Sequence, residues 1–299
     1  MKEAMKPWKW AALLGIAGMV LCALLLLRQR AVPVPVLMYH HFIEAETVRA
    51  DTVVTARRFD EQMKALKDAG YTAITPEELI AYVDGEGELP EKPVLITMDD
   101  GYTSNLTIAA PILEQYGMKA TVFAVGINVG QVNYVHSGKP LDPPRFGWEE
   151  ARPWWEKGVI QVQSHTYDLH QRADYGFSGR DGVLPLKGER EEDYRTVLEE
   201  DIKKAKKGLS QGLGAEMNAL AFPFGLYTDV AVEELEKDGV RLTLTTEYGC
   251  SRAEVGQAES IQCMKRWGIS DRITGEALVD GLETLCGQGR DGLLQNFKK

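Results

Sequence analysis

The 299-residue chain has little positive charge, few cysteines and no internal repeat. Its 34 lysine and arginine residues stand against 44 acidic residues, which gives a net charge of −10. Nucleic acid is therefore not expected as a partner, because phosphate binding needs a basic surface. With 44% hydrophobic residues and no low-complexity tract, the chain is expected to form one large domain of roughly 250 residues plus an appendage.

Cysteine is scarce, and none of the four cysteines is spaced as CxxC, which argues against a cysteine metal site. Cys22 lies in an apolar segment, so three cysteines remain for the rest of the chain: Cys250, Cys263 and Cys286. At most one intramolecular disulfide can form among three. We favour Cys250 with Cys263, although the sequence does not decide the pairing.

The amino-terminal segment, residues 1–30, contains an uncharged apolar run from Trp10 to Leu27 that is long enough to span a bilayer. Three lysines precede the run and two arginines follow it, which favours export of the remainder. A cleaved signal peptide, giving a secreted protein, is the alternative, but no convincing cleavage site is present. We predict a single-pass membrane anchor in residues 1–30 and an extracellular domain in residues 31–299.

Strands and helices are predicted to alternate after a short Pro-Val linker at residues 32–35. Apolar runs predict strands at residues 34–42, 71–75, 92–101, 119–126, 159–165, 218–225 and 240–246. Helical spacing of apolar residues predicts helices at residues 56–70, 75–85, 105–117, 148–158, 191–213 and 229–239. This alternation implies an α/β fold with parallel strands. The chain length and strand count favour a closed or nearly closed (β/α) barrel over an open sheet.

The segment "LITMDDGY", residues 95–102, ends a buried run with two adjacent carboxylates, Asp99 and Asp100. A strand followed by a turn explains this pattern, since Asp and Gly are common turn residues. A binding site explains it equally well, because ligands of α/β proteins collect at the carboxyl ends of strands.

Four of the five histidines lie at the ends of two of the predicted strands, as the pairs His40 and His41, and His165 and His170. On a continuous helix the last two would point about 140° apart, so they converge only if the strand ends near His165. Two imidazoles and one carboxylate form an open metal site, for which Zn²⁺ fits best and Co²⁺, Ni²⁺ or Fe²⁺ are alternatives. A second, uncoordinated carboxylate could then take a proton from the metal-activated water.

The ordered motifs "TMDDGY", "SHTYDLH" and "FPFG" resemble those of the polysaccharide deacetylases, the NodB-homology group or carbohydrate esterase family 4. The resemblance covers residues 34 to 275. It implies a distorted (β/α) barrel of the NodB type. It also implies a metal-dependent hydrolase that removes N-acetyl groups from an extracellular or cell-wall polysaccharide containing N-acetylglucosamine. The long spacing between the histidines in "SHTYDLH" is similar to that of the poly-N-acetylglucosamine deacetylases.

This resemblance also implies roles for individual residues. Asp99 is expected to be the general base, and the metal ligands are expected to be Asp100, His165 and His170. The substrate and its oxyanion are expected to lie near Tyr102, Pro223 and Phe224, with a backbone N–H near Phe224 as donor. Phe224 replaces the tyrosine that is usual in this motif, so a phenol contact to sugar is lost while a backbone donor remains.

Two family features are missing from the sequence. No histidine follows His170, so the usual late general acid is absent. By the poly-N-acetylglucosamine branch we expect His40 to be the acid, with His41 as the weaker candidate and simple packing of His40 as the alternative. Ala221 stands where the family usually has an arginine, and Arg266 is our candidate for orienting Asp99.

Other residues have simpler interpretations. His136 lies in a polar insertion, shows no partner signature in the sequence and is expected to be a loop residue. Trp154 and Trp155 could stack on sugars, but on an amphipathic helix they are expected to belong to the core. Two further functions stay open: a catalytically inactive glycan-binding module with the same fold, and a metal-dependent amidase that acts on a small non-sugar amide.

Overall fold

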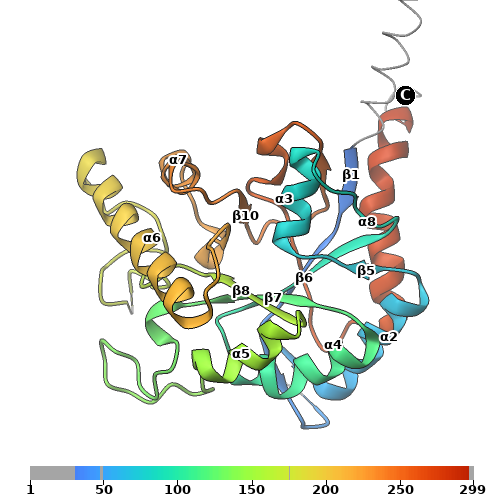
Figure 1. Ribbon diagram of the computed structural model, residues 1–299, viewed down its shortest axis with the longest axis horizontal. Helices are drawn as coiled ribbons and strands as arrows, with labels where there is room; N and C mark the ends of the chain where they lie inside the picture. The colour runs from blue at the N-terminus through green and yellow to red at the C-terminus, as the bar shows by residue number, and fades with distance from the viewer. Residues whose placement is uncertain (1–30, 48–49, 175, 296–299) are drawn as a thin grey trace, which may run out of the picture.

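The computed structural model describes residues 31–47, 50–174 and 176–295 (Figure 1). The predicted anchor in residues 1–30 lies outside these residues. Within them, no helix combines the length and the apolar character that crossing a bilayer requires.

A parallel β-sheet forms the centre of the molecule. Its strands are β2 (Val36–Tyr39), β5 (Thr72–Ala73), β6 (Pro93–Asp99), β7 (Ala120–Ala124), β8 (Ile160–Ser164), β9 (Ala219–Ala221), β10 (Leu242–Leu244) and β12 (Trp267–Gly268). The main path runs in the order β10-β9-β8-β7-β6-β2-β12, and β5 pairs with the first residues of β6. All of these pairings are parallel, as the alternation of strands and helices predicts.

The sheet curls into a half-barrel. At one edge β12 pairs with β2, and on the same segment Met264 forms an isolated bridge with Leu244 of β10 at the other edge. The α/β class and the parallel strands are therefore confirmed. A short segment, rather than a full-length strand, spans the two edges.

Helices cover the outside of the sheet (Figure 1). They are α2 (Ala56–Asp68), α3 (Pro76–Asp84), α4 (Ala110–Tyr116), α5 (Trp148–Glu156), α6 (Glu191–Leu213), α7 (Asp229–Lys237) and α8 (Gly275–Gln295). Capping explains their boundaries: Thr55, Thr75 and Thr228 accept backbone N–H groups at the first turns of α2, α3 and α7. A π-helical turn, η1 (Asn105–Ala109), leads into α4.

Trp154 and Trp155 of α5 are partly buried and pack against the hydrophobic core, as expected.

Two expectations about the periphery are wrong. The supposed linker at residues 32–35 belongs largely to β1 (Ala31–Val34), which pairs antiparallel with β11 (Ser251–Glu254). The disulfide joins Cys250 to Cys286, not to Cys263. Sequence periodicity did not identify α8, which carries Cys286. Nothing in the sequence therefore indicated that Cys286 lies beside Cys250. Within the described part of the chain Cys263 remains unpaired.

Candidate metal centre and active site

The geometry of the site begins with the alternation of side chains along β6, all seven residues of which are buried. Val94, Ile96 and Met98 join the core cluster beneath α2 and α4. Leu95 joins a second cluster with residues of β9 and β10. Because side chains alternate with a period of two, Thr97 and Asp99 share the face of Leu95. The strand therefore places the Asp99 carboxylate inside the curl of the sheet.

Asp99 forms a buried bidentate ion pair with Arg266. The two guanidinium NH₂ groups donate to the two carboxylate oxygens of Asp99, each at 2.8 Å, and both side chains are almost fully buried. Arg266 Nε donates to the Thr245 carbonyl at 2.6 Å. Burial alone would raise the pKa of Asp99, but Arg266 outweighs it and holds this pKa far below its usual range. The expected contact between Arg266 and Asp99 is present.

Unlike Asp99, Asp100 has a carboxylate oxygen without a partner: its Oδ1 atom is buried and has no hydrogen-bond partner among the described residues. Its backbone is left-handed, with φ 74°. Thr166 and Phe224, each just after another strand, are left-handed too, with φ 69° and 59°. Such conformations cost about 1–3 kcal/mol each and cluster at functional sites. Among described non-glycine residues only Cys263 joins these three.

Two histidines face the orphaned oxygen. His170 Nε2 lies 3.3 Å and His165 Nε2 3.7 Å from Asp100 Oδ1. His165 Nδ1 lies 2.7 Å from the Ala221 carbonyl, which can only accept, so Nδ1 carries the proton and Nε2 presents a lone pair. Burial, with His165 nearby, lowers the pKa of His170 to about 4, which also favours a neutral imidazole.

These three side chains fit a divalent cation. One ligand atom from each of Asp100, His165 and His170 lies within 4.8 Å of the others. Ligands about 2.1 Å from a tetrahedral ion lie about 3.4 Å apart, close to the two distances above. An unpartnered buried carboxylate oxygen between two imidazole lone pairs is costly without a cation. We call these three residues the metal cluster.

His40 lies beside the metal cluster and Asp99, whereas His41 points into a different environment. Burial lowers the pKa of His40, Asp99 and Asp100 oppose this effect, and Arg266 adds to it. His41 Nδ1 instead lies 2.9 Å from Ser104 Oγ, which also accepts the Phe42 N–H. His41 thus ties the segment after β2 to the segment after β6.

The three predicted substrate residues border the same site. The Phe224 ring lies 4.7 Å from that of His170, centre to centre, and Pro223 is buried beside it. The Tyr102 ring lies under the Arg145 guanidinium, 3.7 Å from its carbon. Burial, and then Asp100, raise the pKa of Tyr102.

Sequence reasoning missed the residues that hold the loop between the two histidines. Buried Asp201 of α6 accepts the backbone N–H groups of Tyr167 at 2.7 Å and Asp168 at 2.8 Å. His136 is a loop residue, as expected, and its Nε2 lies 2.8 Å from Asp168. The sequence did not indicate the contact of Asp201, because acidic residues are common on a polar helix. It did not indicate the contact of His136 with Asp168 either, because that contact joins two loops.

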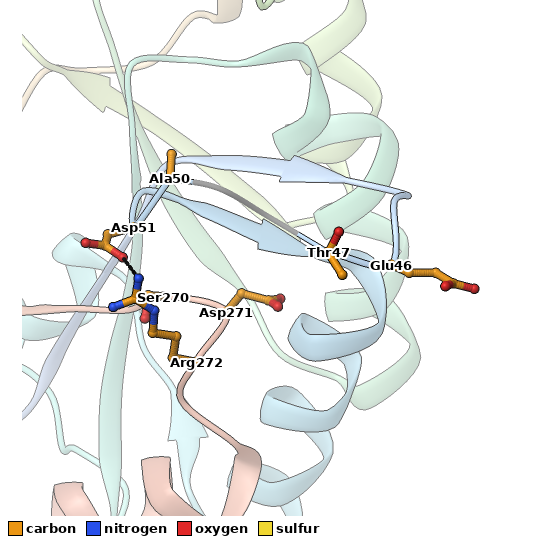
Figure 2. Close-up of a pocket in the computed structure, with 7 residues that line it drawn as sticks. All are labelled: Glu46, Thr47, Ala50, Asp51, Ser270, Asp271 and Arg272. Atoms are coloured by element: carbon orange, nitrogen blue, oxygen red, sulfur yellow. Dashed lines mark ion pairs between the residues drawn. The ribbon is translucent and has the colours of Figure 1, made fainter.

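A separate surface pocket of about 210 Å³ lies between the segment after β12 and the loop that joins β3 (His41–Ile43) to β4 (Val53–Thr55) (Figure 2). It is lined by Glu46, Thr47, Ala50, Asp51, Ser270, Asp271 and Arg272. An ion pair of 3.3 Å joins Asp51 to Arg272, and Asp271 accepts from the Thr55 backbone. The contacts are structural, and no predicted site residue lines this pocket.

Comparison with known proteins identifies the family of these motifs. A family model described as polysaccharide deacetylase matches residues 86–243, more than half of the chain. The Bacillus subtilis protein YxkH, whose name places it provisionally among the polysaccharide deacetylases, is 27% identical over 86% of this chain and 78% of its own length. The poly-β-1,6-N-acetyl-D-glucosamine N-deacetylase of Staphylococcus epidermidis is 27% identical over 65% of this chain and 61% of its own length.

Among solved structures, the de-N-acetylase from Aggregatibacter actinomycetemcomitans has the same fold, with a TM-score of 0.71. It is 22% identical, and the match covers 84% of this chain and 99% of that one.

Proposed function

The chain belongs to the polysaccharide deacetylase family, and we propose that it removes N-acetyl groups from a polysaccharide containing N-acetylglucosamine. Family membership makes it a hydrolase of a carbon–nitrogen bond. The observation that carries the proposal is the contrast between two adjacent carboxylates. Asp99 is paired and charged, whereas Asp100 directs an unpartnered oxygen at two histidines.

The cation we propose for the metal cluster is Zn²⁺, because one oxygen and two nitrogen ligands suit it; Co²⁺, Ni²⁺ and Fe²⁺ accept similar ligands. When bound, it would supply Lewis-acid activation of water and of the acetamide carbonyl. The chain's own contribution is to orient the two imidazoles and the Asp100 carboxylate toward one point. The Ala221 carbonyl does this for His165 by accepting from Nδ1, so that Nε2 is the nitrogen that faces Asp100.

Asp99 would act as the general base. Arg266 keeps it ionised and fixes both of its oxygens, so its lone pairs can accept a proton only along a narrow range of directions. His40 would be the proton donor to the leaving amine. Burial lowers the pKa of His40, and Asp99 and Asp100 are the nearby charges that oppose this effect and favour its protonated form. The backbone near Phe224 and the Tyr102 side chain would contact the acetyl group or the sugar.

For the substrate we propose poly-β-1,6-N-acetylglucosamine first, because that polymer is printed in the name of the Staphylococcus epidermidis relative. A neutral polymer also suits a chain with a net charge of −10.

For location we propose that residues 1–30 anchor the protein in the membrane, with residues 31–299 outside. The course of β1 and β2 is consistent with such a placement. Val36 at the start of β2 pairs with Leu95, and Tyr39 at its end pairs with Met98 beside Asp99. An anchor that precedes Ala31 would thus lie near the amino-terminal ends of the strands, whereas the metal cluster lies at their carboxyl-terminal ends.

Acetate release tests the function. Metal-loaded chain should release acetate from β-1,6-linked N-acetylglucosamine oligomers, and chitin oligomers serve for comparison. The Asp99→Asn variant should lose this activity, whereas Asp229→Asn, at an exposed position at the start of α7, should keep it. No acetate from any N-acetylated glycan, with any of the four cations, would refute the proposal. Release from a small non-sugar amide alone would favour an amidase.

A further inference from the structure

Exposed apolar side chains gather in two loops next to the metal cluster. Among described residues, seven large apolar side chains are exposed, and five of them lie in the loops after β7 and β8. These five are Val132, Tyr134, Val135, Phe177 and Leu186. Exposed apolar groups concentrated in one region mark an interaction surface rather than a random scatter.

The centre of this region is a stack of two rings. The Phe177 and His136 rings lie 4.7 Å apart, centre to centre, and are almost parallel at 7°. Phe177 is 75% exposed, so the stack does not bury it. We call this pair the aromatic shelf.

Hydrogen bonds and a close polar contact join the shelf to the loop that carries the two histidines of the metal cluster. His136 Nε2 lies 2.8 Å from the carboxylate of Asp168, which stands between His165 and His170 in the chain. The Gln171 side chain accepts the Phe177 N–H and donates to the Asp168 carbonyl, each at 2.7 Å. An exposed phenylalanine fixed in this way loses little further freedom when a ligand packs on it.

Further contacts place the Phe177 loop over the other side of the site. Gly182 N donates to the Gln171 carbonyl at 2.8 Å, and a Cβ on Gly182 would lie 3.1 Å from the Pro223 carbonyl. The Arg172 guanidinium lies 5.0 Å from the centre of the Phe224 ring. The loop therefore runs from the metal ligand His170 across Phe224 and back.

From this arrangement we infer that the aromatic shelf binds a sugar ring of the glycan chain next to the residue that is deacetylated. The inference rests on the proposed function. A pyranose presents an apolar C–H face that packs on a flat aromatic ring, and its hydroxyl rim finds polar partners around the ring. Asp168, which lies 2.8 Å from His136, and Arg172 are the polar side chains that could supply such partners.

The test compares long and short substrates with the full-length, metal-loaded chain. Phe177→Ala should lower kcat/KM for an N-acetylglucosamine pentamer about tenfold, through KM, and leave the disaccharide unchanged. Phe177→Trp should restore the pentamer value. Tyr248→Ala, which removes another exposed aromatic ring outside the two loops, should change neither substrate. Calorimetric titration of the metal-free chain with the pentamer should show the same weakening for Phe177→Ala.

The outcomes separate this inference from the proposed function. If the wild-type chain releases acetate from neither substrate and from no other glycan, the proposed function fails. If it releases acetate from both but Phe177→Ala has equal effects on both, or none, only the shelf is refuted. A smaller sedimenting species for Phe177→Ala with unchanged glycan binding would identify a second copy of the chain as the occupant, which also overturns the inference.

Discussion

The carboxyl edge of the sheet carries two regions built in opposite ways. In the metal cluster and Asp99, charged and polar side chains are buried or partly buried, the backbone is left-handed at Asp100, and all but His170 lie at the end of a strand or directly after it. In the aromatic shelf, rings are exposed, and loop-to-loop hydrogen bonds hold them in place. Acid–base chemistry needs fixed positions shielded from water, whereas contact with a polymer needs an accessible face. The two regions therefore should respond to mutation in different ways.

The largest effect is expected from breaking the buried ion pair. Arg266→Ala leaves the Asp99 carboxylate buried and unpaired, so unfolding free energy should fall by about 3–5 kcal/mol. Arg241→Ala is the matched control, because Arg241 makes the same two-armed contact with Asp84 at the surface. It should cost less than about 1 kcal/mol. Urea unfolding measures both, and similar losses for the two variants would show that burial does not set the strength of the Asp99 pair.

Histidine variants sharpen the comparison within the buried region. His40→Ala should reduce kcat about a hundredfold or more while metal content stays near that of the wild type, because a general acid is lost but no ligand. His41→Ala should have a much smaller effect, since His41 contacts Ser104. His136→Ala should act on long substrates only. Equal and mild effects for all three histidines would refute the assignment of the acid to His40.

The smallest effect is expected from Asp201, which connects the two regions through the 165–170 loop. Burial raises the pKa of Asp201 to about 6, above its usual value of 3.8. The folded chain then binds a proton more tightly than the unfolded chain, so protonation of Asp201 stabilises the fold at low pH. This stabilisation is lost as the pH rises through 6.

An asparagine at this position removes that titration. The stability of the wild type relative to Asp201→Asn should therefore increase by about 1 kcal/mol between pH 7 and pH 5. Thermal or urea unfolding at both pH values gives the difference. A difference that is constant over this range would contradict the raised pKa of Asp201.

The sequence predicted the buried region better than the exposed one, for a physical reason. A long apolar run that ends in "DDG" marks a strand end, and α/β topology brings such ends together. Asp99, Asp100, His165 and His170 could therefore be found without coordinates. The contact between Arg266 and Asp99 was only a hypothesis, because Arg266 directly precedes a strand of two residues that periodicity does not reveal.

The pairing of His136 with Asp168 could not be predicted. It depends on how an insertion folds against another loop, and neither segment has a regular pattern of apolar residues. The same limit explains the wrong disulfide. Cys286 lies on a helix that was not predicted, and Cys263 was nearer in the sequence to Cys250.

The most direct test of the account is to separate the two adjacent aspartates. Metal content and acetate release are measured on Asp99→Asn and Asp100→Asn, with circular dichroism to verify folding. We predict that Asp99→Asn keeps one divalent cation per chain but loses activity about a thousandfold, because only the base is removed. Asp100→Asn should lose both the cation and the activity. Loss of the cation in Asp99→Asn, or its full retention in Asp100→Asn, would contradict the division of roles between these two residues.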